Sequence, residues 1–254
     1  MKIGLACVLF LGLCASLRAQ TPQLAFEEAN KLLEQSQYAD AMKAYHDIER
    51  SGNQAGALFL NMAIASVQLD SMGLAKVYFK AAGAYPSTAE SAERGLEFVE
   101  SQFSRQSARL PKLPWDRAVD NLKEWPTSFG LFFIAFTWVL ISTALFLVRW
   151  FSSISIPNKN ILVGTALGFS FFFAVLALYV DYIELKYDEG VIISSEVNVM
   201  AQPAFDANLV SVGYEGFQVT VDQKTSTSEK DWMYIRLGNG QFGWLPAQHV
   251  KVIP

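Results

Sequence analysis

Two uncharged stretches decide the fold of this chain: PTSFGLFFIAFTWVLISTALFLV at residues 126–148 and ILVGTALGFSFFFAVLALYV at residues 161–180. The hydrocarbon core of a bilayer is about 30 Å thick, and about 20 helical residues can cross it. Backbone groups in lipid must be bonded within their own segment. We therefore expect membrane-spanning helices at residues 128–148 and 161–180. The alternative is a buried helical hairpin of a soluble protein.

The ends of these stretches indicate their orientation. Arg149 and Lys159 flank the connection 149–160, which contains no acidic residue, whereas acidic residues outnumber basic ones beyond the two outer ends. Short loops rich in Lys and Arg tend to stay in the cytoplasm. We predict that residues 149–160 form a cytoplasmic loop and that both outer ends lie on the opposite side of the membrane.

Residues 1–19 have the pattern of a secretory signal peptide. Lys2 precedes an uncharged run from Ile3 to Leu17, and Ala19 is a small residue at the expected end. Cleavage after Ala15 and retention as a short anchor are the alternatives. Removal of this peptide would leave the mature N-terminus outside the cytoplasm, in agreement with the loop charges. The predicted location is the bacterial inner membrane, with the N-terminal and C-terminal parts in the periplasm.

Composition argues against several classes of function. The formal charge of −4 disfavours nucleic acid as a partner, since nucleic acid is bound by a basic face. Both cysteines, Cys7 and Cys14, lie in the signal segment, and His46 and His249 are the only histidines, so we expect no metal site and no cofactor. His46 is expected on a solvated helix face. The spans contain no ionisable residue that could carry ions or protons. No catalytic motif is recognisable, and we expect that the protein is not an enzyme.

Residues 21–105 contain an internal repeat. A shift of 34 residues aligns similar side chains: Phe26 with Leu60, Ala29 with Ala63, Ala41 with Ala75, and Tyr45 with Phe79. This is the period of the tetratricopeptide repeat, a helix–turn–helix unit that the segment from Tyr38 to Tyr45 resembles. A further helix at about 88–103 would cap the stack, and a generic helical bundle is the alternative. Stacked repeats form a groove for partner segments, so Asn30 and Asn61 are candidate partner-binding residues.

Residues 106–127 connect the repeats to the first span. Two prolines, Pro111 and Pro114, stop any helix, and apolar residues from Trp115 to Trp125 then recur at helical spacing. This pattern predicts either a short interfacial helix or a plain juxtamembrane linker. In the second span, Gly164 and Gly168 form a GxxxG pattern, which is a candidate for close packing against the first span or against another protein.

Residues 188–254 change to short segments of alternating apolar and polar residues, punctuated by Gly, Pro, Asn and Asp. The pair Asn239-Gly240 between two such segments predicts a β-hairpin with a type I′ turn, which needs positive φ at both residues. Several short strands in so short a segment are expected to curl into a small β-barrel.

The order of residues in this segment resembles the bacterial SH3-like domain. An asparagine-containing strand (Asn198) is followed by a Trp-Tyr strand and, after the hairpin, by Gly243-Trp244. In the Trp-Tyr strand, Trp232, Tyr234 and Arg236 share one face.

An exposed aromatic groove on this domain would suit peptides or peptidoglycan fragments. The candidate partner-binding residues are Tyr214, Trp232, Tyr234, Arg236 and Trp244. The alternative, which we prefer from the residue types alone, places the aromatic rings in the hydrophobic core.

The order of the parts resembles that of BatE-type proteins of the Bacteroides aerotolerance operon. The expected fold class is a multidomain membrane protein with an all-α tetratricopeptide-like solenoid, a transmembrane helical hairpin and an all-β SH3-like barrel. The resemblance implies a non-enzymatic component in aerotolerance or stress resistance. Its implied partners are von Willebrand A-type membrane proteins and a MoxR-type ATPase system.

Two binding modules tethered on the same side of a bilayer would have a raised effective concentration for a shared partner. The leading hypothesis is therefore a membrane-anchored scaffold that gathers envelope proteins. The alternative, from a different class, is a cell-wall receptor or sensor whose SH3-like domain binds peptidoglycan.

The predicted topology can be tested with reporter fusions placed after Phe103 and after Pro254. Both fusions should report export, because the chain is expected to cross the lipid twice between them. A cytosolic signal from either fusion would contradict the topology.

Overall fold

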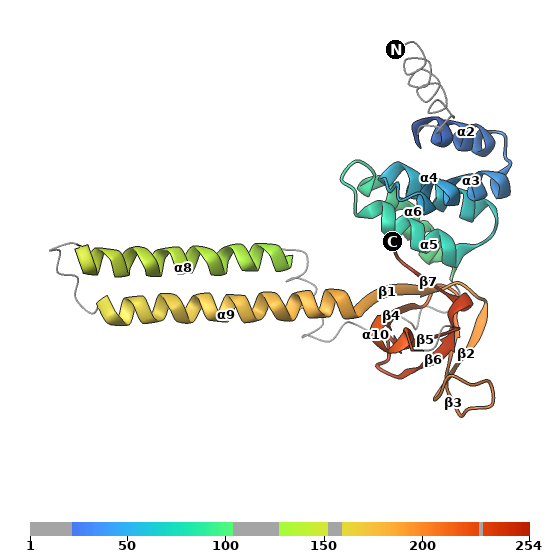
Figure 1. Ribbon diagram of the computed structural model, residues 1–254. Coiled ribbons are helices and arrows are strands. Elements are labelled where there is room, and N and C mark those ends of the chain that lie inside the picture. The colour runs from blue at the N-terminus through green and yellow to red at the C-terminus, as the bar shows by residue number, and fades with distance from the viewer. Residues whose placement is uncertain (1–21, 104–126, 152–158, 229–230) are drawn as a thin grey trace, which may run out of the picture.

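The computed structural model describes residues 22–103, 127–151, 159–228 and 231–254. The predicted signal peptide, nearly all of the linker 106–127 and most of the loop 149–160 lie outside the described residues. Figure 1 shows a group of N-terminal helices, a long helical hairpin and a C-terminal β-sheet module.

The N-terminal region is helical, as predicted. Its helices are α2 (Pro22–Glu34), α3 (Tyr38–Arg50), α4 (Gly56–Gln68), α5 (Met72–Gly83) and α6 (Ala89–Gln102). The small residues that align in the repeat, among them Ala29, Ala41 and Ala63, are fully buried, which lets neighbouring helices approach closely. The turns repeat as well: Ser36 and Asp70, one repeat period apart, both have positive φ.

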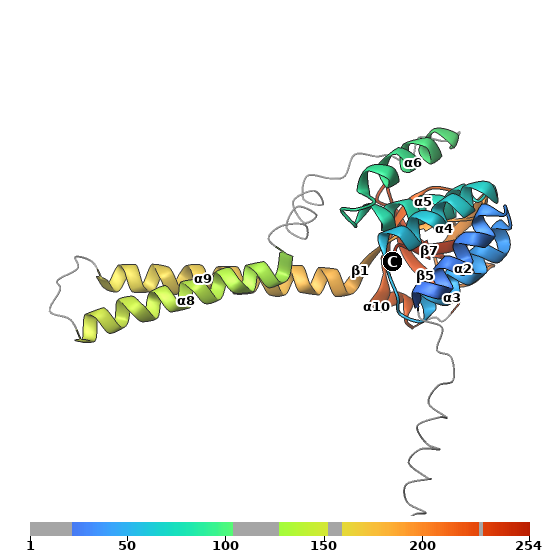
Figure 2. The ribbon, with the colours of Figure 1, turned by 90° about the horizontal axis from the view of Figure 1, so that it is seen from above.

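The helical hairpin consists of α8 (Thr127–Phe151) and α9 (Lys159–Lys186), which lie side by side in both views (Figures 1 and 2). Both are long and apolar enough to cross a membrane, and only 17% of the apolar window of each is buried. A core hairpin of a soluble protein would be mostly buried, so the exposed apolar surface favours the membrane interpretation.

The contact between the two helices does not use the GxxxG pattern, and its buried residues include Leu131, Ala177 and Val180. Trp138 of α8 stacks on Phe169 of α9, with 5.2 Å between ring centroids. A Cβ added at Gly164 or Gly168 would meet no atom within 4 Å, so these glycines do not lie at the α8–α9 contact. The sequence left open whether the GxxxG pattern packs against the first span or against another protein. In the described structure it does not pack against the first span.

Helix α9 continues beyond the apolar stretch and passes directly into a β-strand. The predicted span ends at residue 180, and the helix continues beyond it to Lys186 because no Gly or Pro interrupts it. Strand β1 begins at Tyr187. Lys186 lies 3.6 Å from Asp222 and 4.8 Å from the ring centroid of Tyr187. These contacts hold the junction between helix and strand.

The C-terminal module is one antiparallel sheet with strand order β3-β2-β6-β5-β4-β1-β7. The bounds are β1 (Tyr187–Ile192), β2 (Glu196–Met200), β3 (Leu209–Tyr214), β4 (Gln218–Asp222), β5 (Trp232–Leu237), β6 (Phe242–Pro246) and β7 (Val250–Val252), with a short helix α10 (Gln223–Ser226) before β5. Its core is aliphatic and includes Ile192, Val199, Ile235 and Leu245. Strand β7 was missed because three residues are too few to reveal an alternating pattern.

The β5–β6 hairpin was predicted correctly, but its turn type was not. Gly240 has φ +83°, whereas Asn239 does not have positive φ, so the turn is not type I′. Leu237 N–H donates to the Gln241 carbonyl and Gly240 N–H to the Leu237 carbonyl, both at 2.9 Å. Leu237 and Gln241 are therefore the last paired residues, and the loop between them consists of Gly238, Asn239 and Gly240. In this three-residue loop, Gly240 has the left-handed backbone conformation.

The N-terminal helices dock on the β-sheet module, and we call residues 22–103 and 187–254 together the head. The Glu215 side chain accepts a hydrogen bond from Gly73 N–H at the start of α5 (2.7 Å), and Lys76 Nζ donates to the Gly216 carbonyl (3.0 Å). Lys80 pairs with Glu189 of β1 at 2.9 Å. The whole head lies at one end of the α8–α9 hairpin (Figures 1 and 2).

We predict that Lys76→Ala destabilises the head by about 2–3 kcal/mol, because it leaves the Gly216 carbonyl and the carboxylate of Glu100, 3.5 Å from Lys76 Nζ, without this partner. For a unit of this size the loss corresponds to a melting temperature lower by about 5 °C or more. Thermal unfolding of the detergent-solubilised protein, followed by circular dichroism, measures the effect.

Arg94→Ala is the matched control, since Arg94 pairs with Glu90 on the exposed surface of α6, where an ion pair contributes little. Equal melting temperatures for the two variants would contradict a stabilising role of Lys76 at the docking contact.

Candidate functional site

The outer face of β5 and β6 carries a continuous group of aromatic side chains, which we call the aromatic face: Phe205, Trp232, Tyr234, Phe242 and Trp244. Tyr234 and Trp244 lie directly opposite each other on paired strands, with ring centroids 5.1 Å apart. Tyr234 also stacks on Phe242 at 6.0 Å. From the β2–β3 loop, Phe205 covers Trp232 at 4.9 Å. The rings therefore form one surface across two strands and a loop.

Strand alternation explains why these rings point outward. Ile235 and Leu237 of β5 and Leu245 of β6 are buried in the aliphatic core, so their neighbours in sequence must face the other side. Trp232, Tyr234 and Trp244 are half-buried, whereas Phe205 is 81% and Phe242 51% exposed. Our preference for a core role is wrong for Trp232, Tyr234 and Trp244, because the strands place aliphatic side chains inside.

Gly243 makes this arrangement possible. A Cβ at this position would lie 2.5 Å from Val199 Cγ1 and 2.8 Å from the Met200 carbonyl oxygen. Strand β2 pairs with β6 only through Met200 and Trp244, next to an irregularity between Val199 and Met200. The glycine thus admits β2 against β6, while the tryptophan after it points to the aromatic face.

The predicted site residues of the β-sheet module fall into two places. Arg236 lies on the aromatic face, opposite Phe242 in the strand register. Tyr214 lies elsewhere: it forms an edge-to-face pair with Phe217 at 5.5 Å and lines a separate cleft beside β3. Sequence reasoning missed Phe205 and Phe242. Phe242 follows the hairpin at a position that alternates with Trp244, but Phe205 sits in an irregular loop without a periodic signal.

Asn30 and Asn61, the candidate groove residues, come together in the helical region. The Asn30 Oδ1 atom accepts hydrogen bonds from the Tyr45 hydroxyl at 2.8 Å and from Asn61 Nδ2 at 2.9 Å. These bonds join α2, α3 and α4, and both asparagines are half-buried. Burial raises the pKa of Tyr45 to about 12, so its hydroxyl stays a donor at neutral pH.

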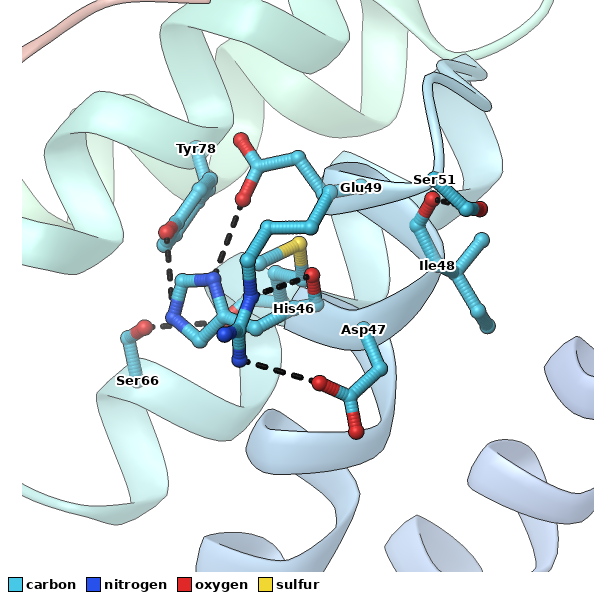
Figure 3. A network of polar contacts seen from close by, with 9 residues as sticks. His46, Asp47, Ile48, Glu49, Ser51, Ser66 and Tyr78 are labelled. Atoms are coloured by element: carbon cyan, nitrogen blue, oxygen red, sulfur yellow. Dashed lines mark hydrogen bonds and ion pairs between the residues drawn. The ribbon is translucent and has the colours of Figure 1, made fainter.

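His46 belongs to a polar network (Figure 3). Its Nδ1 atom lies 3.0 Å from Glu49 Oε2, and its Nε2 atom lies 3.5 Å from the Tyr78 hydroxyl. The expectation of a solvated His46 holds only in part: 31% of its side chain is exposed, and the Tyr78 ring of α5 lies 6.0 Å from the imidazole ring. The hydrogen bond from His46 lowers the pKa of Glu49, and burial raises that of Tyr78.

In the parts of the chain that the structure describes, no group of three or more His, Cys, Asp or Glu side chains is placed to hold a metal ion. The His46 network joins α3 and α5. The aromatic face is therefore the surface whose side chains are best placed to bind a ligand.

Comparison with known families agrees with this choice. Residues 198–251 match the model of the GW (Gly-Tryp) dipeptide domain, a segment that contains Gly243-Trp244 and the whole aromatic face. The search of curated proteins found no match for this chain. The C-terminal module is thus similar to GW domains. Its Gly-Trp pair is Gly243-Trp244, in which the glycine allows β2 to pack against β6.

We predict that Gly243→Ala destabilises the head by about 1–3 kcal/mol, because the added methyl group overpacks the contact between β2 and β6. The melting temperature of the head should fall accordingly. Gly83→Ala is the control, since a Cβ there would meet only Ala92 Cβ, at an ordinary 3.9 Å. An unchanged melting temperature for Gly243→Ala would contradict the packing role of this glycine.

Proposed function

We propose that this chain is a non-enzymatic, membrane-anchored protein of the cell envelope whose C-terminal module binds cell-wall material, with peptidoglycan as the ligand. The observation that carries the proposal is the exposed aromatic face, which lies within a segment similar to the GW domain. Domains of this bacterial SH3-like class are wall-binding modules, and we extend that role to this chain.

The chemistry of the aromatic face suits such a ligand. Aromatic rings offer large, rigid apolar surfaces that pack against the apolar faces of sugars or against peptides at a small cost in side-chain entropy. Arg236 on the same face can pair with a carboxylate of the ligand. Four of these side chains stand on paired strands, so the surface is formed before the ligand binds.

The same proposal includes the finer architecture. The α2–α6 region would be a tetratricopeptide-like solenoid and the sheet an SH3-like barrel, as in the BatE-type proteins that the order of parts resembles. Helices α8 and α9 would cross the inner membrane, with the head in the periplasm. The location of the whole head at one end of the hairpin supports this placement.

A scaffold for envelope proteins is the second candidate function. One observation favours it: the β-sheet module covers α5, whereas α4 and α6 keep exposed apolar side chains, Ile64 and Phe98. These side chains would bind a partner segment, together with the Asn30–Asn61 pair of the same helical region. Under the resemblance to BatE-type proteins, the partners would be von Willebrand A-type membrane proteins and a MoxR-type ATPase system in aerotolerance or stress resistance.

Co-sedimentation of the full-length, detergent-solubilised protein with purified peptidoglycan tests the leading proposal. The wild-type protein should sediment, and the double variant Phe205→Ala/Phe242→Ala should bind at least about tenfold more weakly, since a loss of about 1.4 kcal/mol suffices for that factor. Both phenylalanines are exposed, so their removal leaves the fold intact.

Phe98→Ala is the matched control, because Phe98 is an exposed aromatic residue of the helical region and should not affect sedimentation. Wild-type protein that stays in the supernatant would refute wall binding. Crosslinking in native membranes would then identify the protein partners that the scaffold candidate requires.

A further inference from the structure

A cleft of about 210 Å³ lies beside strand β3, separate from the aromatic face. Its apolar walls are Tyr214, Phe217 and Leu237, and its polar lining comes from Ser211, Gln218 and Asn239. Sites for drug-sized molecules typically measure about 300–1,000 Å³. The cleft is smaller than these, and its size suits a single side chain.

Among the strands of the described residues, β3 forms one end of the sheet, with β2 as its neighbour in the strand order. Its backbone groups on the other edge are therefore available to a further strand. Exposed edge strands normally carry a charged residue or a proline that prevents such pairing. The sequence of β3, Leu-Val-Ser-Val-Gly-Tyr, contains neither, and Leu209 is 56% exposed. The edge is thus open to pairing and unprotected.

The lining of the cleft indicates what kind of segment would pair there. None of the side chains that line it is charged, so a charged ligand group would lose its hydration without gaining a partner. The Ser211 hydroxyl can instead bond to a peptide group, whereas the Gln218 side chain already donates to Glu189 and the Asn239 side chain is bonded to Gln241. Edge and cleft are continuous, because Ser211, Val212 and Tyr214 of β3 also line the cleft.

We propose that the outer edge of β3 binds an extended, uncharged peptide segment of another envelope protein by β-strand addition, and that one apolar side chain of this segment enters the cleft. Main-chain hydrogen bonds to β3 supply affinity in this mode of recognition, and the side-chain pocket supplies specificity. The site is independent of wall binding, because its residues do not overlap with the aromatic face.

The test uses the full-length protein in lipid nanodiscs and a fluorescently labelled peptide, Ac-Thr-Val-Phe-Val-Thr-NH₂, whose binding is followed by anisotropy. The wild-type protein should bind this peptide with a Kd of about 10–100 μM, as expected for one short strand. Leu209→Lys and Val212→Lys each place a charge on the edge or in the cleft and should weaken binding at least tenfold. Leu24→Lys is the matched control, since Leu24 of α2 is 52% exposed, much as Leu209 is, and this variant should bind as the wild type does.

A peptide that is N-methylated at alternate residues cannot complete the strand ladder and should not bind. Equal binding of the methylated and unmodified peptides, unchanged binding by both lysine variants, or no binding to the wild-type protein would each overturn the proposal. A wild-type dimer in nanodiscs that Leu209→Lys converts to a monomer would show that a second copy occupies the edge, which would also overturn it. Circular dichroism of each variant establishes that the head remains folded.

Discussion

The direct passage of α9 into β1 is the constraint on which the rest of the structure depends. Consecutive residues of β1 serve two cores: Val191 packs in the core of the N-terminal helices, and Ile192 packs in the core of the sheet. The same strand pairs with β4 and β7, and its Glu189 bonds to Lys80 of α5. A single strand thus joins the membrane hairpin, the helical region and the β-sheet module.

Because of this junction, the α8–α9 hairpin is joined to the head without a flexible linker at the end of α9. A flexible tether would let two binding modules search a volume and would raise their effective concentration for a shared partner. Here Lys186 at the end of α9 contacts Asp222 and the Tyr187 ring. Hydrogen bonds of Glu215 with Gly73 and of Lys76 with Gly216 join α5 to the β3–β4 turn. These contacts join the helical region, the β-sheet module and the end of α9 directly.

The Gly-Trp pair places a residue with a packing role beside a residue of the proposed binding surface. Gly243 brings β2 against β6, and this contact places Trp244 in the ring cluster with Tyr234. Function on this surface would then depend on a residue that touches no ligand. The cleft at β3 is formed differently, by an edge strand and the root of a hairpin, so the two proposed binding surfaces share no residue.

Local patterns in the sequence determined the elements: the uncharged stretches gave two long helices, the 34-residue period gave helix pairs with buried alanines, and alternation gave most of the strands. Each of these signals reflects interactions within a few residues or one repeat. The tertiary structure alone decided the outward direction of the aromatic rings, the place of Tyr214 in a separate cleft, the partners of His46 and the docking of Lys76 on Gly216. Lys76 and Gly216 are 140 residues apart in the sequence. The cleft and the aromatic face likewise consist of residues from separate strands and loops. Only the packing of the whole chain brings these groups together.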